Sequence, residues 1–204
     1  MQGVKLLGVC GRKRHGKDTI GEFLREGWDY TPIAFADPIK RICMDIYGLS
    51  YDQCYGGDEY KEVVDERWGL TPRYIMQRVG TEMGREVHKE TWVRYCFEQI
   101  ERARRREPVI LHIPAKRGFF PAASSGVNAS QWVVTDVRLP DEARAVQNRG
   151  GRVIKAIRPS LLQGAVDMHQ TETCIDDIRA DHLLLNDGGL AQLRARLSSY
   201  MGTL

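Results

Sequence analysis

Hydrophobic and polar positions follow two patterns along this chain: short apolar runs, and longer stretches whose apolar residues recur three or four positions apart. The first pattern predicts strands and the second predicts helices. We expect strands near residues 4–10, 31–36, 109–113, 132–136, 152–157 and 182–186. We expect helices near residues 17–26, 38–47, 72–85, 92–105, 141–149 and 188–200. This alternation indicates an α/β fold with a mostly parallel sheet flanked by helices.

Two segments show neither pattern. Residues 48–71 are rich in Tyr, Asp and Gly, and we expect an irregular flap that closes over a bound nucleotide. Residues 114–130 carry Pro, Gly, Ser and Asn, and a lid, an insertion and a disordered loop all fit this composition. We expect a single domain over residues 1–204, because this length can bury one sizeable core.

The expected helix over residues 72–85 begins with an N-cap threonine and a proline, Thr71-Pro72. Steps of about 100° per residue place a polar stripe and a core face on different sides. The polar stripe holds Arg73, Gln77, Gly80 and Gly84, and the core face holds Ile75, Met76, Val79 and Met83. Glycine inside a helix costs about 1 kcal/mol relative to alanine. The two glycines therefore either admit a close approach to the backbone or are incidental on a solvated face.

A glycine- and lysine-rich loop directly follows the first expected strand. Gly11 and Gly16 let the backbone curl so that several N–H groups point toward a phosphate chain, and Lys17 reaches the β and γ phosphates. The helix that starts near Gly16 adds the positive end of its dipole. The hydroxyl residue that usually follows the lysine is displaced by one position, since Asp18 precedes Thr19. The chain is therefore expected to bind a nucleoside triphosphate.

Composition narrows the class of protein. The chain has 204 residues, 42% hydrophobic and 28% charged, which is ordinary for a soluble globular protein. A net charge of +3 gives little support to binding of polymeric nucleic acid. Five scattered cysteines, with no Cys-x-x-Cys pair, fit reduced thiols in a cytoplasm. No apolar run reaches membrane-spanning length, so we expect no membrane partner.

Acidic and basic side chains follow two expected strands at the sheet edge where open α/β folds bind ligands. Asp136 is a candidate to hold Mg²⁺, and Arg138 a candidate to neutralise charge on a transferring phosphoryl group. Glu142 either favours the helix dipole or orients Arg138. Asp37 follows the other strand, where it accepts a hydrogen bond from an acceptor hydroxyl, acts as a base, or caps the following helix.

Two further features allow more than one interpretation. Trp92 falls off the apolar stripe of its helix and either stacks on a base or covers the core. His169 and Glu172 lie one turn apart without a second pair of ligands, which favours a local hydrogen-bonded turn over a metal site.

Taken in order, these residues resemble the phage deoxynucleoside monophosphate kinases. The resemblance rests on Gly16-Lys17-Asp18-Thr19, Phe35-Ala36-Asp37-Pro38-Ile39-Lys40, Thr71-Pro72-Arg73 through Gln77, Gly80-Thr81, Arg85, Trp92, Thr135-Asp136-Val137-Arg138 with Glu142, Gly150-Gly151, His169-x-x-Glu172 and Asn186-Asp187-Gly188. The pieces span nearly the whole chain, and only the phosphate loop is specific by itself.

The resemblance implies a P-loop NTPase fold like that of nucleoside monophosphate kinases, with mobile lid and flap segments. It implies ATP with Mg²⁺ as donor and a deoxynucleoside 5′-monophosphate as acceptor. Donor binding would use Gly11, His15, Gly16, Lys17, Asp18 and Thr19, with Asp136 and Thr19 at the metal. The catalytic residues would be Lys17, Asp136, Arg138 and Glu142. The acceptor would contact Asp37, Lys40, Arg73, Gln77, Gly80, Thr81, Arg85 and Trp92.

Two other functions fit parts of the sequence. Another small-molecule P-loop kinase, such as one resembling dephospho-coenzyme A kinase, would share the loop and much of the sheet. A partner-stimulated NTPase switch would share only the loop, and the modest net charge favours it little. The sequence leaves open which bases are accepted, whether deoxyribose is preferred over ribose, and whether the chain forms a homodimer.

Overall fold

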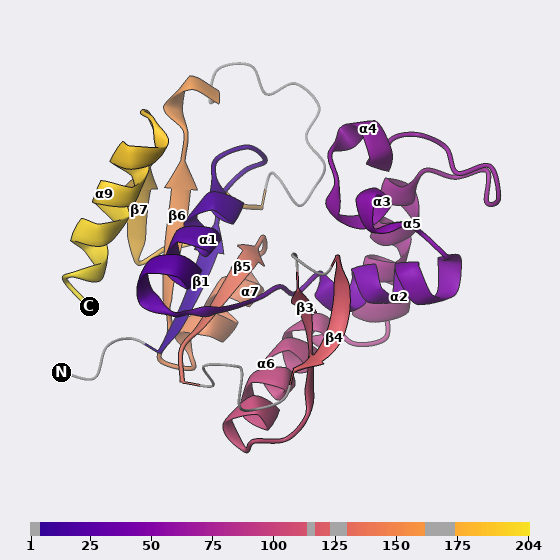
Figure 1. Ribbon diagram of the computed structural model, residues 1–204, viewed down its shortest axis with the longest axis horizontal. Helices are drawn as coiled ribbons and strands as arrows, with labels where there is room; N and C mark the ends of the chain where they lie inside the picture. Colours follow the sequence, from indigo (N-terminus) through magenta and orange to yellow (C-terminus); the bar gives the residue numbers. More distant parts are fainter. Residues whose placement is uncertain (1–4, 114–116, 123–129, 162–173) are drawn as a thin grey trace. The chain divides into compact units, whose positions relative to one another are not determined.

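The computed structural model describes residues 5–113, 117–122, 130–161 and 174–204 (Figure 1). The chain divides into two compact units, which are described one at a time. Unit 1 comprises Met1–Ala34 and Val127–Leu204, and unit 2 comprises Phe35–Gly126. The single-domain assignment stays a prediction. His169 and Glu172 lie outside the described residues, so their expected turn also stays a prediction.

Unit 1 is built on a five-stranded sheet in which every neighbouring pair is parallel, in the order β2-β5-β1-β6-β7. Its strands are β1 (Leu6–Cys10), β2 (Thr31–Ile33), β5 (Trp132–Val137), β6 (Arg152–Ile157) and β7 (His182–Leu185). All residues of β1 are buried, as expected for a central strand covered on both faces. The α/β class and the parallel sheet are therefore confirmed.

Helices cover both faces of this sheet. They are α1 (Lys17–Trp28), α7 (Pro140–Gln147) and α9 (Leu190–Met201), with a short 3₁₀ helix η4 at Pro159–Leu161. Leu7 and Val9 of β1 join Ile20 of α1 and Leu193 of α9 in one buried cluster. Gly8 points the other way, since a Cβ there would meet Val146 of α7 at 3.4 Å. Figure 1 shows α9 beside β7 at one edge of the sheet. No helix in the described ranges is long and apolar enough to cross a membrane.

Unit 2 is mainly helical and has its own core. Its helices are α2 (Asp37–Tyr47), α3 (Tyr51–Tyr55), α4 (Asp58–Lys61), α5 (Pro72–Arg78), the π-helix η1 (Val79–Arg85) and α6 (Thr91–Arg104). A buried cluster joins Cys43, Leu49, Cys54, Ile75 and Val79 from the first half of the unit. The expectation of an irregular segment over residues 48–71 was wrong, because α3 and α4 both lie in it.

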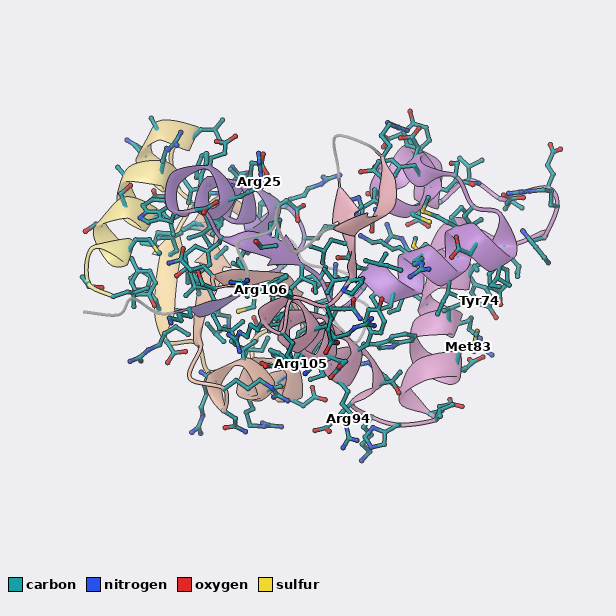
Figure 2. All side chains as sticks on the ribbon, turned by 60° about the horizontal axis from the view of Figure 1, so that its bottom comes forward. Arg25, Tyr74, Met83, Arg94, Arg105 and Arg106 are labelled. Carbon is teal, nitrogen blue, oxygen red and sulfur yellow. The ribbon has the colours of Figure 1, made fainter. Side chains whose placement is uncertain are left out.

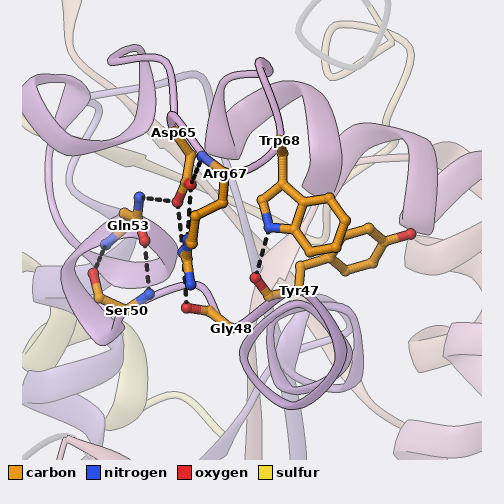
Figure 3. Close-up of polar contacts among 7 residues, drawn as sticks. All are labelled: Tyr47, Gly48, Ser50, Gln53, Asp65, Arg67 and Trp68. Atoms are coloured by element: carbon orange, nitrogen blue, oxygen red, sulfur yellow. Dashed lines mark hydrogen bonds and ion pairs between the residues drawn. The ribbon is translucent and has the colours of Figure 1, made fainter.

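Polar contacts order the rest of this segment (Figure 3). Asp65 accepts hydrogen bonds from Gln53 at 3.0 Å and from the Arg67 guanidinium at 2.6 and 2.9 Å. The same guanidinium donates to the Gly48 carbonyl at 3.0 Å. The Trp68 indole N–H donates to the Tyr47 carbonyl at 2.8 Å. These contacts join residues up to twenty-one positions apart, so local periodicity could not reveal them.

The helix expected over residues 72–85 changes type partway along. Thr71 caps it as predicted, since its hydroxyl accepts the Tyr74 N–H at 3.2 Å, and Ile75 and Val79 are buried as predicted. From Val79 onward the helix is a π-helix, to which steps of 100° per residue do not apply. The assignment of Met83 to the core face was wrong, because 52% of this residue is exposed (Figure 2). Gly84, assigned to the polar stripe, is buried.

The expected strand at residues 109–113 does not join the parallel sheet. It is β3 (Val109–Ile113), which pairs antiparallel with β4 (Gly118–Ala122). The pairing places β4 inside a segment that was expected to have no regular structure. The Gln99 side chain of α6 accepts the Ile110 N–H at 3.3 Å and links this hairpin to the preceding helix.

Candidate active site

The loop between β1 and α1 needs glycine at two positions. Gly11 has φ +149°, and a Cβ there would lie 2.7 Å from the Ala156 carbonyl of β6. Gly16, the N-cap residue of α1, has φ +98°, and a Cβ would lie 2.6 Å from the Asn186 amide nitrogen. Both backbone conformations are unfavourable for other residues. The glycines therefore let the loop pack against the ends of two neighbouring strands as well as leave room for a ligand.

Buried contacts hold this loop in place. Lys17 is 9% exposed, and its ammonium donates to the Arg12 carbonyl at 2.9 Å. His15 is 3% exposed, and its Nδ1 lies 3.3 Å from both the Ala156 carbonyl and the Arg158 N–H. Asn186 donates its side-chain amide to the His15 carbonyl at 3.1 Å. His15 is thus a supporting residue inside the loop, and the Lys17 ammonium lies over the loop.

A cavity of about 310 Å³ opens beside the start of α1. It is lined by Arg14, Gly16, Lys17, Asp18, Thr19, Arg158, Asn186, Leu190 and Leu193. Four of the expected donor-binding residues therefore come together, whereas Gly11 and His15 do not reach the lining. The cations suit phosphate groups, and the two leucines offer an apolar wall to a base. Sequence reasoning missed Arg158, Leu190 and Leu193, because nothing in their local pattern distinguishes them from ordinary core and surface positions.

Asp136 of β5 and Arg138, which directly follows β5, lie at the end of the strand that is adjacent to this loop. Val137 pairs with Cys10, the last residue of β1, so Asp136 and Arg138 flank the point where β1 gives way to the loop. Glu142 of α7 is 3% exposed and accepts the backbone N–H groups of Arg138 at 2.8 Å and Leu139 at 3.1 Å. Glu142 therefore fixes the backbone at Arg138, which agrees with an orienting role.

Two residues near the loop between β1 and α1 carry oxygen atoms of the kind that bind Mg²⁺. Within the described residues, no group of three or more His, Cys, Asp or Glu gathers as a metal cluster. Thr19 lines the cavity, and Asp136 stands at the end of β5. Mg²⁺ prefers oxygen ligands and keeps several waters beside substrate phosphates. The hydroxyl of Thr19 and the carboxylate of Asp136 are ligand types that fit that preference.

In unit 2, Asp37 is the first residue of α2 and is buried. It is not the N-cap, which is Ala36, so the capping interpretation was wrong. The Tyr55 hydroxyl donates to its carboxylate at 3.0 Å. The ammonium of Lys40 lies 3.8 Å from the centre of the Tyr55 ring, a cation–π contact. Sequence reasoning missed Tyr55, which lies eighteen positions from Asp37.

His112 of β3 extends this cluster. Its ring stacks on Tyr55 with 3.9 Å between centroids, and its Nε2 lies 3.1 Å from the Tyr51 hydroxyl. Burial and the nearby positive charge of Lys40 lower the pKa of His112 to about 4. The imidazole is therefore neutral near neutral pH.

Arg73 is already engaged in this structure. Its guanidinium pairs with Asp58 at 2.7 Å and with Glu62, both near α4. Gln77 and Arg85 are partly buried farther along the helix, and Thr81 is exposed. The structure therefore places Arg73 among carboxylates, which a bound phosphate would have to displace.

The two glycines of the π-helix accommodate Trp92. A Cβ at Gly84 would lie 2.1 Å from the indole, and the indole N–H donates to the Gly80 carbonyl at 2.7 Å. The Trp92 side chain therefore makes the close approach to the backbone that one interpretation of the two glycines expected. Trp92 is 6% exposed, which favours its core interpretation over stacking on a base.

Comparison with known proteins identifies a family. The model of the deoxynucleotide monophosphate kinase family matches residues 50–197. A protein of Acanthamoeba polyphaga mimivirus, provisionally named deoxynucleotide monophosphate kinase, is 29% identical over 204 residues, which cover 95% of this chain and 94% of that protein. The uncharacterised protein ORF77 of Ictalurid herpesvirus 1 (strain Auburn) is 29% identical over 63% of this chain and 47% of its own length.

Among solved structures, the dephospho-CoA kinase of Campylobacter jejuni aligns over 98% of this chain and 96% of its own. Its sequence identity is 16% and its TM-score is 0.46.

Proposed function

Because the chain belongs to the deoxynucleotide monophosphate kinase family, we propose that it transfers the γ-phosphoryl group of ATP to a deoxynucleoside 5′-monophosphate. The products are ADP and the deoxynucleoside diphosphate. The observation that carries this proposal is the cavity beside α1, where Lys17 and Thr19 meet two arginines and an apolar wall. The name of the mimivirus relative agrees with a role in deoxynucleotide supply, and a bacteriophage source stays a prediction.

On the donor side, the backbone N–H groups of the loop and the start of α1 bind the phosphate chain. Lys17 and the cavity arginines, Arg14 and Arg158, neutralise its charge. Thr19 and Asp136 would hold Mg²⁺, which would neutralise negative charge on the phosphate chain. The base lies against Leu190 and Leu193.

On the acceptor side, Arg73 binds the 5′-phosphate through its forked guanidinium. Asp37 accepts a hydrogen bond from a hydroxyl of the deoxyribose, and Tyr55 orients its carboxylate. Gln77, Thr81 and Arg85, which follow Arg73 along the same helix, also contact the acceptor. Gly80 and Trp92 pack together and shape this helix.

During transfer, an oxygen of the acceptor phosphate forms a bond to the γ phosphorus as the bond to the β,γ-bridging oxygen breaks. The acceptor oxygen is already ionised near neutral pH, so no base has to remove a proton. Positioning and neutralisation of charge then supply most of the rate enhancement. Arg138, held by Glu142, meets the charge that develops on the transferring group.

The test is a coupled assay of ADP release with Mg·ATP. The panel of acceptors holds dAMP, dGMP, dCMP, dTMP, the four ribonucleotides, dephospho-coenzyme A and no acceptor. Turnover with deoxynucleotides above the ribonucleotides supports the proposal and gives the range of bases. Turnover only with dephospho-coenzyme A, or equal hydrolysis without acceptor, overturns it and leaves the nucleotide-binding loop standing.

A further inference from the structure

Three cationic side chains from three helices of unit 2 gather around α3. Lys40 of α2 lies over the Tyr55 ring, and its backbone carbonyl is 3.8 Å from the Cys54 thiol. Lys61 is the last residue of α4. Arg73 of α5 pairs with Asp58 and Glu62, which stand three positions before and one after Lys61. These ion pairs bring the guanidinium of Arg73 alongside Lys61.

The charges in this group act on one another. Burial and the positive charges of Lys40 and Arg73 lower the pKa of Lys61, against the opposing effects of Asp58 and Cys54. Within the described residues, no carboxylate lies within 4 Å of the ammonium group of Lys61 or of Lys40. Asp58 and Glu62 are both used by Arg73. Bringing like charges together in a partly buried site costs free energy, which a bound anion would recover.

We propose that Lys40, Lys61 and Arg73 together bind the 5′-phosphate of the acceptor, with Lys61 as a phosphate-binding residue that no sequence motif identifies. This inference rests on the proposed function and deepens it. A phosphate monoester carries close to two negative charges near neutral pH, more than one cation neutralises. The flat fork of Arg73 can hold two of its oxygens, and each lysine supplies a point charge for the remainder.

The three cations differ in what holds them before a ligand arrives. The Tyr55 ring fixes Lys40, and the carboxylates of Asp58 and Glu62 pair with the guanidinium of Arg73 beside α4 until a phosphate displaces them. Lys61 has no such partner in the part of the chain that the structure describes, so its ammonium is available to a ligand.

The first experiment measures the ionisation of Lys61 directly. Lysines are reductively methylated with ¹³C, which keeps their charge, and the Lys61 signal is assigned by its loss in Lys61→Arg. Its pKa should lie below those of the exposed lysines and should rise when dAMP, dGMP, dCMP or dTMP is added. The matching deoxynucleosides, which lack the phosphate, should not move it. An unchanged Lys61 pKa with all four monophosphates overturns the inference.

The second experiment compares Lys61→Gln with Lys89→Gln, an exposed lysine of the same unit that makes no ion pair among the described residues. We expect Lys61→Gln to weaken binding of the deoxynucleoside monophosphate by about tenfold or more and to leave the deoxynucleoside unaffected. Lys89→Gln should bind both as the parent protein does. Thermal unfolding checks that the variants fold, and loss of a crowded charge should not lower the melting temperature of Lys61→Gln.

The outcomes separate this inference from the proposed function. If the monophosphates raise the pKa of Lys61 but are not phosphorylated, the kinase activity is disproved and the anion site is retained. Phosphoryl transfer with an unchanged acceptor KM in Lys61→Gln would disprove the anion site and leave the kinase activity standing.

Discussion

The phosphate loop of unit 1 and the group of Lys40, Lys61 and Arg73 in unit 2 both carry cationic side chains, yet these are held in different ways. In the loop, backbone carbonyls bind buried side chains: Lys17 donates to the Arg12 carbonyl and Asn186 to the His15 carbonyl. In unit 2, Arg73 is fixed by ion pairs with Asp58 and Glu62, all three of them partly exposed.

The difference indicates what each region does when a ligand arrives. Ion pairs at an exposed surface contribute only about 0–1 kcal/mol, so a phosphate can displace Asp58 and Glu62 from Arg73 at small cost. Displacing the buried loop contacts would leave polar groups unsatisfied, at about 1–3 kcal/mol each. The donor side is therefore expected to be preformed, and the acceptor side to exchange partners.

The largest effect should come from Lys17→Ala. The substitution removes the cation that lies over the loop, and we expect kcat/KM to fall by about 10³-fold with the fold intact. Steady-state kinetics and circular dichroism measure the two effects, with Lys89→Ala as the control. Retained transfer would contradict the assignment of the loop to the donor.

The next effect should be confined to the acceptor. Arg73→Ala removes the forked phosphate ligand, and we expect the KM of the deoxynucleoside monophosphate to rise about 10- to 100-fold. The KM of ATP should change little. An equal loss of ATP affinity would break the division into a donor side and an acceptor side.

The rigidity of the loop is tested with a pair of glycines. Gly11→Ala puts a Cβ 2.7 Å from the Ala156 carbonyl at a φ of +149°, and we expect a loss of about 2–3 kcal/mol of stability together with weaker ATP binding. Gly27→Ala lies near the end of α1 with nothing within 4 Å, so it should be neutral or up to about 1 kcal/mol stabilising. Urea denaturation of both variants measures the difference. Similar stability of the two would show that the loop is not tightly held.

The free energy of unfolding should depend on pH through His112, whose ring stacks on those of Tyr51 and Tyr55. The pKa of His112 is lowered to about 4 in the folded protein, so the unfolded chain binds a proton first as pH falls below about 6.5. Stability should therefore be full above that pH and fall by up to about 3 kcal/mol as pH approaches 4. His112→Phe, which keeps an aromatic ring for stacking, should flatten the decrease between pH 7 and pH 5. If His112→Phe loses as much stability as the parent protein over this pH range, other titrating groups cause the loss.

The smallest effect tests whether the ion pairs of Arg73 compete with the acceptor phosphate. Glu62→Gln loosens the hold on Arg73, and we expect the acceptor KM to fall about two- to threefold without a change in the KM of ATP. Glu59→Gln, on the short helix α4 that Glu62 caps and without an ion pair among the described residues, is the control. A rise in acceptor KM for Glu62→Gln would mean that the carboxylate positions Arg73 for the phosphate.

Sequence reasoning worked where the controlling interactions are local. The central strand, the glycine loop and α1 follow from neighbouring residues, and so does the Thr71 cap with Pro72. The parallel sheet followed from the alternation of strands and helices. The placement of Asp136 and Arg138 beside the loop followed from a general rule about strand ends, and the register of β5 against β1 agrees with it.

Tertiary packing decided the rest. The switch to a π-helix at Val79 accompanies the packing of Trp92 against Gly80 and Gly84, and it took Met83 out of the core. Tyr55 meets Asp37 across eighteen positions, and Lys61 lies near Lys40 across twenty-one. Periodicity and motifs report what a residue shares with its neighbours in sequence. The sequence by itself thus determined the sheet and the phosphate loop, whereas only the packing of separate helices brought Lys40, Lys61 and Arg73 together.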